Sequence, residues 1–167
     1  MAGKRTIINN APVKYHNFAG IETPKNKKDD VNFEIILDEE TARNMMADID
    51  KDGVGWYIKT SEDDDGNIIE YRIKLRLGQK GDPQVFVIGD DGKAIPFNRG
   101  QWRRLDRMTI SYVDVEFHQS RKTFEYQGKE YYSAYVDNLF VNIVENSLYK
   151  KYGIAPDYAD DEMDLDD

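Results

Sequence analysis

The sequence predicts a mainly β protein, an OB-type, partly open barrel of five strands with extra hairpins. Three observations lead to this prediction. Short segments rich in β-branched and aromatic residues alternate with turn residues, one amphipathic helical pattern lies among them, and the last residues are strongly acidic. At 167 residues the chain has the length of one domain. We therefore expect a single OB-like domain over residues 1–154 and a disordered acidic tail over residues 155–167.

The strands are predicted from composition and from the turns between them. Explicit turn sequences include Asp65-Gly66-Asn67, Gly81-Asp82-Pro83 and Gln127-Gly128. The expected strands are Val13–Phe18, Val31–Leu37, Trp56–Thr60, Ile68–Leu77, Gln84–Ile88, Lys93–Phe97, Thr109–His118, Thr123–Tyr126 and Tyr131–Val144.

One helix is predicted at about residues 38–50. Asp38 is a suitable N-cap and two glutamates follow it in the first turn. Its apolar stripe consists of Ala42, Met45, Met46 and Ile49. A second, short helix is expected near residues 100–105.

Composition excludes several classes of protein. The chain is 40% hydrophobic and 33% charged, and it has no cysteine. Disulfides, zinc–thiolate sites and thiol nucleophiles are therefore excluded. No apolar run reaches the roughly 20 residues of a membrane helix. We expect a soluble, cytoplasmic protein that has no contact with membranes.

The net charge of −9 is unevenly distributed. Residues 1–28 carry +5, residues 29–70 carry −11, residues 71–134 carry +4, and residues 135–156 are neutral. Residues 157–167 carry −7. Basic segments therefore coexist with an acidic end, which leaves a nucleic-acid partner open despite the overall sign.

Two acidic runs resemble metal sites. Asp48 to Gly53 has the beginning of an EF-hand loop, but Lys59 stands where the bidentate glutamate belongs. Ser61 to Gly66 could hold catalytic metals, but consecutive acids cannot all converge on one ion. We interpret the first run as a helix-to-strand turn and the second as a hairpin tip, and expect no metal site.

No catalytic constellation is found. His16 and His118 lie within predicted strands, and the sequence has neither a phosphate-binding loop nor a dinucleotide fingerprint. We expect a protein that is not an enzyme and uses no cofactor.

The most informative strand combines an apolar face with a basic one. Alternation places Tyr71, Ile73, Leu75 and Leu77 on the core face and Arg72, Lys74 and Arg76 on the other face. Three cations about 7 Å apart suit the phosphates of a nucleic acid. The alternative is an ordinary solvated face whose charges pair with neighbouring strands.

A second segment combines bases and aromatics on a predicted hairpin. Unpaired bases stack on aromatic rings while cations follow the backbone. The candidates on this hairpin are Arg121, Lys122, Phe124, Tyr126, Lys129, Tyr131 and Tyr132, and Tyr57 and Lys59 join them from an earlier strand. A similar pairing recurs at Trp56 and at Trp102-Arg103-Arg104. Together these features favour a protein that binds single-stranded nucleic acid.

Several ordered segments resemble the small single-stranded DNA-binding proteins of tailed bacteriophages. The matching segments are Asn17 to Gly20, Val31 to Phe33, Leu37 to Ala42, Asp52-Gly53 with Trp56 and Lys59, Ile73 to Leu75, Pro83 to Ile88, and Gly128 with Ala134 to Val136 and Val141. The resemblance implies an OB-type barrel that coats single-stranded DNA during phage replication, recombination and repair, in the cytoplasm of the bacterial host. The family's Arg-Pro-Tyr-x-Trp stretch is replaced here by Ser120 to Phe124.

The acidic tail resembles those with which such proteins recruit replication and recombination partners. The expected partner-binding residues are Asp157, Asp160, Asp161, Glu162, Asp164, Asp166 and Asp167. Unlike many of those tails, this one does not end in an aromatic residue. The alternative is a solubilising end that binds no partner.

Other interpretations stay open at this point. The −11 of residues 29–70 suits an acidic DNA mimic that inhibits a host nucleic-acid enzyme, although the basic strand opposes this. A virion component is a third possibility. The sequence leaves open whether the chain forms homo-oligomers, whether it prefers DNA to RNA, and which aromatics face the groove.

Overall fold

The computed structural model describes residues 4–145 and 151–153. Strands dominate this part of the chain. The elements are β1 (Arg5–Ala11), β2 (Val13–Asn17), β3 (Asn32–Leu37), α1 (Glu39–Ala47), β4 (Gly55–Trp56), β5 (Ile58–Glu62), β6 (Ile68–Arg76), β7 (Gln84–Ile88), β8 (Ala94–Phe97), the 3₁₀ helix η1 (Arg99–Arg107), β9 (Thr109–Tyr126) and β10 (Lys129–Val144).

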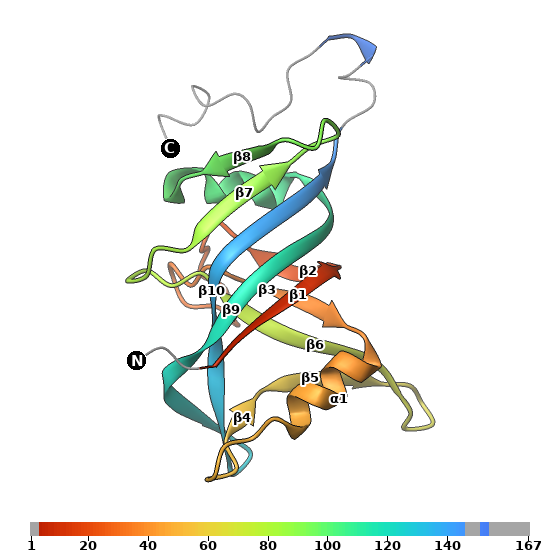
Figure 1. Cartoon of the computed structure of the whole chain (residues 1–167), viewed down its shortest axis with the longest axis vertical. Coiled ribbons are helices and arrows are strands. Elements are labelled where there is room, and N and C mark those ends of the chain that lie inside the picture. The colour runs from red at the N-terminus through yellow and green to blue at the C-terminus, as the bar shows by residue number, and fades with distance from the viewer. Residues whose placement is uncertain (1–3, 146–150, 154–167) are drawn as a thin grey trace.

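The long strand β10 organises the sheet. One edge pairs antiparallel with β9 over most of its length, and the other pairs in succession with β4, β6 and β7, all parallel. The path continues from β6 to β3 and β2, while β1 borders β9. Figure 1 shows the resulting sheet curled into an open half-barrel. The mainly β, partly open barrel predicted from the sequence is confirmed.

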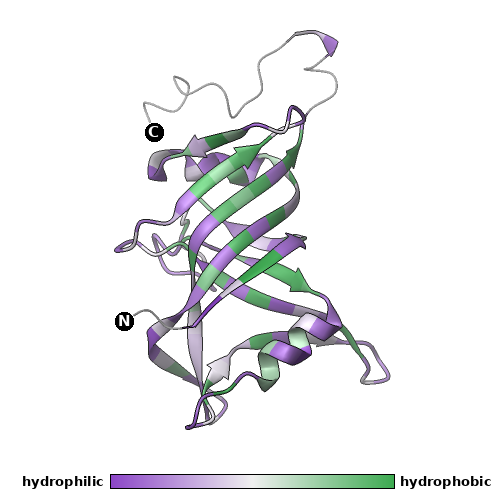
Figure 2. Cartoon of the chain, viewed as in Figure 1, coloured by the Kyte–Doolittle hydropathy of each residue, from purple (hydrophilic) through white to green (hydrophobic). Residues whose placement is uncertain are grey.

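The core fills the inner face of this curled sheet. Alternate residues of β6, β7, β9 and β10 are buried there, and Figure 2 shows the matching alternation of apolar and polar residues along β9 and β10. The inner side chains include Phe33, Ile35, Ile73, Leu75, Val85, Val87, Val113, Val115, Phe117, Leu139 and Val141. Buried apolar surface of this extent is the main stabilising contribution to such a fold.

Both predicted helices are present. Asp38 caps α1, since its carboxylate accepts a hydrogen bond from the Thr41 amide at 2.7 Å. The predicted apolar stripe of this helix is confirmed at two of its four positions. Ala42 and Met45 are buried, whereas Met46 and Ile49 are 47% and 58% exposed. Because α1 ends at Ala47, Ile49 lies beyond the helix and cannot extend its apolar face.

Strand boundaries differ from prediction at three places. Strand β1 was missed, because its alternating pattern is interrupted by the polar pair Asn9-Asn10. The strand expected at residues 56–60 is divided between β4 and β5. The strands expected at residues 109–118 and 123–126 form one continuous strand, β9, because a bulge rather than a break accommodates the polar residues between them.

No helix in the described residues is long and apolar enough to cross a membrane. The predicted tail, residues 155–167, and its boundary at residue 154 lie outside the described residues.

Candidate nucleic-acid interface

The predicted alternation of β6 is confirmed. Tyr71, Ile73 and Leu75 are buried, while Arg72, Lys74 and Arg76 are only partly covered on the opposite, outward face. Strand β3 lies antiparallel beside β6 with Glu34 directly opposite Lys74. We call the outward surface formed by Arg72, Lys74, Arg76 and Lys59 the basic face.

Carboxylates from neighbouring positions neutralise part of this basic face. Glu34 accepts from Arg72 Nε at 2.9 Å and from Lys59 Nζ at 3.0 Å. Arg72 also donates to Glu70 at 2.7 Å and to the Ser61 hydroxyl at 2.6 Å. The Arg72 side chain is 12% exposed and that of Glu34 10%. Arg72 is therefore largely committed to holding β3, β5 and β6 together.

The other two cations of β6 differ from each other. Arg76 donates to both carboxylate oxygens of Asp30 at 2.8 Å. Lys74 makes no hydrogen bond or ion pair within the described part of the chain. Burial, together with the nearby Arg76 charge, lowers the pKa of Lys74. Lys74 is thus the cation on this face with the least compensation, and an anion would improve its surroundings.

The hairpin of β9 and β10 carries the predicted aromatics, and they gather around Tyr57. Phe124 lies opposite Tyr131 in the register, and Tyr126 lies opposite Lys129, so all four side chains belong to one face. The Tyr57 ring centroid is 4.9 Å from that of Tyr131, 5.3 Å from Tyr126 and 5.7 Å from Phe124. We call Tyr57, Phe124, Tyr126 and Tyr131 the ring cluster. Burial raises the pKa of Tyr57, which keeps its hydroxyl neutral.

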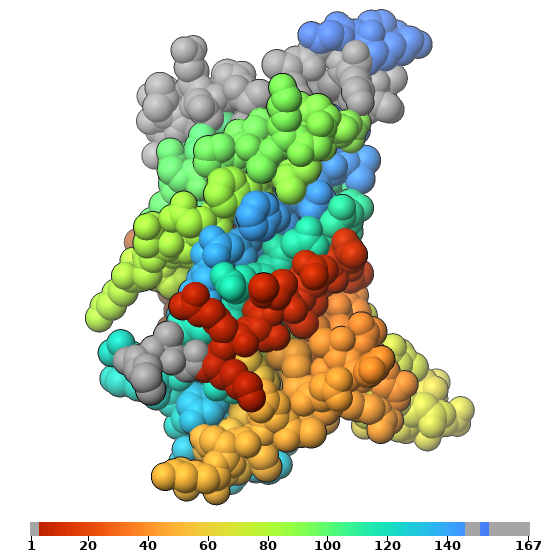
Figure 3. Space-filling model, viewed as in Figure 1, coloured from red at the N-terminus to blue at the C-terminus, as the bar shows by residue number. Residues whose placement is uncertain are grey.

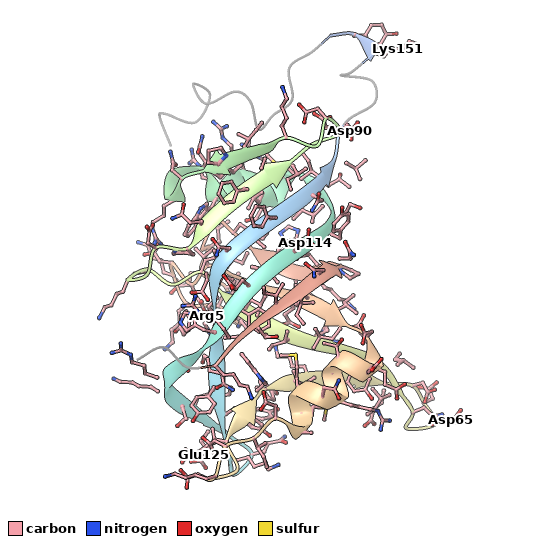
Figure 4. The ribbon with its side chains drawn as sticks, viewed as in Figure 1. Arg5, Asp65, Asp90, Asp114, Glu125 and Lys151 are labelled. Carbon is pink, nitrogen blue, oxygen red and sulfur yellow. The ribbon has the colours of Figure 1, made fainter. Side chains whose placement is uncertain are left out.

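The opposite face of the same hairpin is acidic. Glu125 and Glu130 are cross-strand partners there, and Glu130 accepts from the Thr123 hydroxyl at 3.1 Å. Tyr132 aligns with Thr123 rather than with the ring cluster, and its hydroxyl donates to Asp50 at 2.5 Å. This hydrogen bond raises the pKa of Tyr132. Figure 4 shows Glu125 at the foot of the molecule, at the end of the hairpin.

A hollow joins the basic face to the ring cluster. Its lining comprises Tyr57, Lys59, Ile73, Lys74, Arg76, Phe124, Tyr132, Ser133 and Ala134. Two segments separated by about fifty residues in the sequence therefore form one surface, with cations on the β6 side and rings on the hairpin side. Arg121, Lys122 and Lys129 lie outside this lining but are exposed on the hairpin, where they form no ion pair within the described residues.

The two tryptophan motifs do not contribute rings to this surface. Trp56 is 4% exposed and packs edge-on against Phe117, and Trp102 is 3% exposed beneath the Arg99 guanidinium. Arg104 is buried as well. These aromatic-basic pairs are therefore parts of the core and its edge.

The acidic runs form turns. Asp50 accepts from the amides of Asp52 and Val54, both at 2.9 Å, in the turn after α1. Asp63 accepts from Asp65 and Asn67 in the β5–β6 hairpin turn. No group of three or more His, Asp or Glu residues in the described chain is placed to hold a metal ion.

Sequence reasoning missed Glu34, which compensates two of the predicted phosphate contacts. The sequence contains only part of the information needed to identify this role of Glu34. The glutamate interrupts the apolar run Phe33 to Leu37, which indicates a buried position needing a cation. The pairing of β3 with β6, which identifies that cation, does not follow from either strand alone.

The family model for the phage ssDNA-binding domain matches residues 3–167. No protein with a curated description matches the sequence.

Among solved structures, the single-stranded DNA-binding protein of bacteriophage Enc34 in complex with ssDNA is similar at 9% identity and a TM-score of 0.44, covering 85% of this chain and 88% of that one. The C-terminally truncated form of that protein gives 9% identity, a TM-score of 0.46, and coverage of 85% and 87%.

Proposed function

The chain belongs to the phage ssDNA-binding domain family, and on that basis we propose that it coats and protects single-stranded DNA, without sequence preference, during phage DNA replication, recombination and repair. The observation that carries the proposal is the hollow whose lining brings Lys59, Lys74 and Arg76 together with Tyr57 and Phe124 of the ring cluster. Single-strand binders combine a basic groove for the backbone with rings on which bases stack.

The two sides of the hollow have different roles in this proposal. Lys74, Lys59 and Arg76 contact phosphates on the β6 side, and Arg121, Lys122 and Lys129 extend the positive potential along the hairpin. Tyr57 and Phe124 stack with bases at the hollow, and Tyr126 and Tyr131 do so beside them. Every base has a π-face, so such stacking tolerates any sequence. Arg72 contributes mainly to the fold, because Glu34 and Glu70 already occupy its guanidinium.

The test is a titration of fluorescently labelled oligo(dT) followed by anisotropy, at several salt concentrations and beside a duplex of the same length. Neutralising about four to six phosphates of a single strand gives a log–log salt slope of roughly −3 to −4. We expect binding of the single strand with this slope and much weaker binding of the duplex. A slope near zero, or equal affinity for the duplex, would contradict the proposal.

A charge reversal separates this function from that of an acidic DNA mimic. Lys74→Glu should reduce single-strand affinity strongly, whereas a mimic would bind its target enzyme as before. Lys93→Glu, in the turn between β7 and β8, is the matched control because it changes the net charge equally at an exposed site. Equal loss of affinity in both variants would indicate a general charge effect instead of a specific contact.

The acidic residues 157–167 are proposed to act as a second, competing ligand for the basic face and as the site that recruits replication and recombination proteins. Seven carboxylates in this segment can approach the cations that phosphates would otherwise contact. Deleting the segment should raise DNA affinity at low salt, with a smaller effect at high salt where charges are screened. Unchanged affinity at every salt concentration would contradict the competition.

A further inference from the structure

The outward face of β10 carries a regular series of aromatic pairs that extends well beyond the hollow. Burial alternates along the strand, so that Ala134 and Val136 point inward. A bulge after Val136 adds one residue, and the alternation then resumes with Leu139 and Val141 pointing inward. Tyr131, Tyr135 and Phe140 therefore share the outward face. At about 3.3 Å per residue, neighbouring members of this series are roughly 13 to 16 Å apart.

Each of these rings has an aromatic neighbour from an adjacent strand. Tyr131 has Phe124, with ring centroids 5.8 Å apart. Tyr135 has His118 of β9, its partner in the register, at 6.3 Å and an interplanar angle of 29°. Phe140 has Phe86 of β7, also its register partner, at 4.9 Å and 11°. Both phenylalanines are only half-buried although they are large and apolar.

Cations flank the middle pair. The register places Arg5 of β1 beside His118, and Arg76 of β6 beside Tyr135. A row of side chains thus crosses four neighbouring strands in the order Arg5 (β1), His118 (β9), Tyr135 (β10) and Arg76 (β6). Because Arg76 also lines the hollow, this row is continuous with the interface described above.

The carboxylates near this row have partners. Asp137 contacts His118 at 2.9 Å and Arg5 at 3.7 Å, and Glu116 accepts from the Asn138 amide at 2.8 Å. Asp114, beside Phe140, accepts from the Asn10 amide at 2.9 Å. Figure 4 shows Arg5 and Asp114 along the same side of the sheet. In Figure 3, β10 is visible at the surface between β7 and β9.

From this arrangement we infer that the single-stranded DNA track continues from the hollow along the outward face of β10, with His118–Tyr135 and Phe86–Phe140 as second and third stacking platforms. This inference rests on the proposed function and deepens it. From Tyr131 to Phe140 the track spans about 30 Å, which suits several nucleotides and lies within the roughly 4–16 nucleotide range of an OB domain.

The test compares a short oligo(dT) of about five nucleotides with a long one of about fifteen. The variant is Phe86→Leu with Phe140→Leu, which keeps apolar packing but removes both rings. We expect the long oligonucleotide to lose about ten- to a hundredfold in affinity, whereas affinity for the short one stays within about twofold because the hollow alone holds it. Ile69→Ala, an exposed apolar site near the β5–β6 turn, is the control and should bind both normally.

A measurement on the unaltered chain complements the variant. Photo-crosslinking of a long oligonucleotide that contains halogenated uracil should label peptides containing Tyr135, Phe140 or Phe86. Labels confined to the hairpin and β5, or undiminished affinity of the double variant for the long oligonucleotide, would overturn the extended track and leave the proposed function intact. A shift in oligomeric state with unchanged DNA binding would assign Phe86–Phe140 to self-association and also overturn it. If the unaltered chain bound neither oligonucleotide, the proposed function and the track would both be wrong.

Discussion

The basic face of β6 and the β9–β10 hairpin are both rich in cations in the sequence, but only the β6 arginines form ion pairs with carboxylates in the structure. On β6, Arg72 and Arg76 are paired with Glu34, Glu70 and Asp30. On the hairpin, Arg121, Lys122 and Lys129 project from an exposed ribbon and form no ion pair among the described residues. Arg72 mainly holds strands together and Arg76 must exchange Asp30 for a phosphate, whereas the hairpin cations have no ion pair to break among the described residues.

This difference teaches that a basic strand is not necessarily a basic surface. Carboxylates that are distant in sequence can pair with a cation once the sheet forms, and a cation held in this way is less available to a ligand. Lys74 is the exception on β6, because its cross-strand neighbour Glu34 binds Arg72 and Lys59 instead. Substitutions at individual positions can therefore separate structural cations from those that bind DNA.

The largest effect is expected for stability. Arg72→Met removes the guanidinium that Glu34 and Glu70 share and leaves them with Lys59 and Lys14 as their remaining cations. Because these lysines compensate part of the charge, the loss of stability should be about 3 kcal/mol, the lower end of the range for breaking a buried pair. Chemical denaturation should show this loss. The affinity of the folded protein for oligo(dT) should change by less than about threefold, since Arg72 is not proposed to reach phosphate. A stable variant with strongly reduced affinity would assign Arg72 to the interface instead.

Stacking predicts the next effect. Tyr131→Ala removes one ring of the cluster and should weaken binding by about 1–3 kcal/mol, the range for one stacked base. Tyr152→Ala is the matched control, because Tyr152 is an exposed tyrosine that belongs neither to the ring cluster nor to the lining of the hollow. We expect Tyr152→Ala to weaken binding much less. Equal effects of the two variants in anisotropy titrations would show that the loss is not specific to the ring cluster.

The faces of β6 and the β9–β10 hairpin could be predicted from the sequence. The features that could not be predicted share one cause. Alternation in residues 68–77 correctly assigned both faces of β6, and the turn at Gln127-Gly128 predicted the hairpin. Neither pattern reveals which strand lies beside which. The pairing of Glu34 with Arg72, the contact of Tyr57 with the hairpin and the stacking of Phe86 on Phe140 all depend on tertiary register. The expectation that the motifs at Trp56 and Trp102 belong to the binding surface was wrong for the same reason, because burial depends on neighbours that local composition does not identify.

A smaller effect is expected at Lys74. Lys74→Met keeps the aliphatic stem and removes the charge, so it should weaken binding by about 1 kcal/mol and reduce the magnitude of the salt slope by about 0.7. Stability should stay equal or increase, because the partly buried ammonium has no compensating partner among the described residues. The measurement is the slope of log affinity against log salt concentration, obtained from titrations at several salt concentrations. An unchanged slope would remove Lys74 from the set of phosphate contacts.

The smallest effect is a pH dependence that distinguishes Lys74 from the paired cations. Burial lowers the pKa of Lys74 in the free protein below its ordinary 10.5, and a bound phosphate would raise it again. The complex then holds more protons than the free protein, so affinity falls as pH rises through the lowered pKa. Folding has the opposite sign: the unfolded chain binds more protons, so the penalty from Lys74 diminishes as pH rises.

Titrations from neutral pH to about pH 10 should show this decrease in affinity in the unaltered chain. Lys74→Arg, whose guanidinium stays charged throughout, should flatten it while retaining the salt slope. Ionisation of Tyr57 does not explain such a decrease, because burial raises the pKa of its hydroxyl above the ordinary value. An alkaline loss of equal size in both proteins would show that Lys74 is not the titrating group and would remove it as the source of the pH dependence.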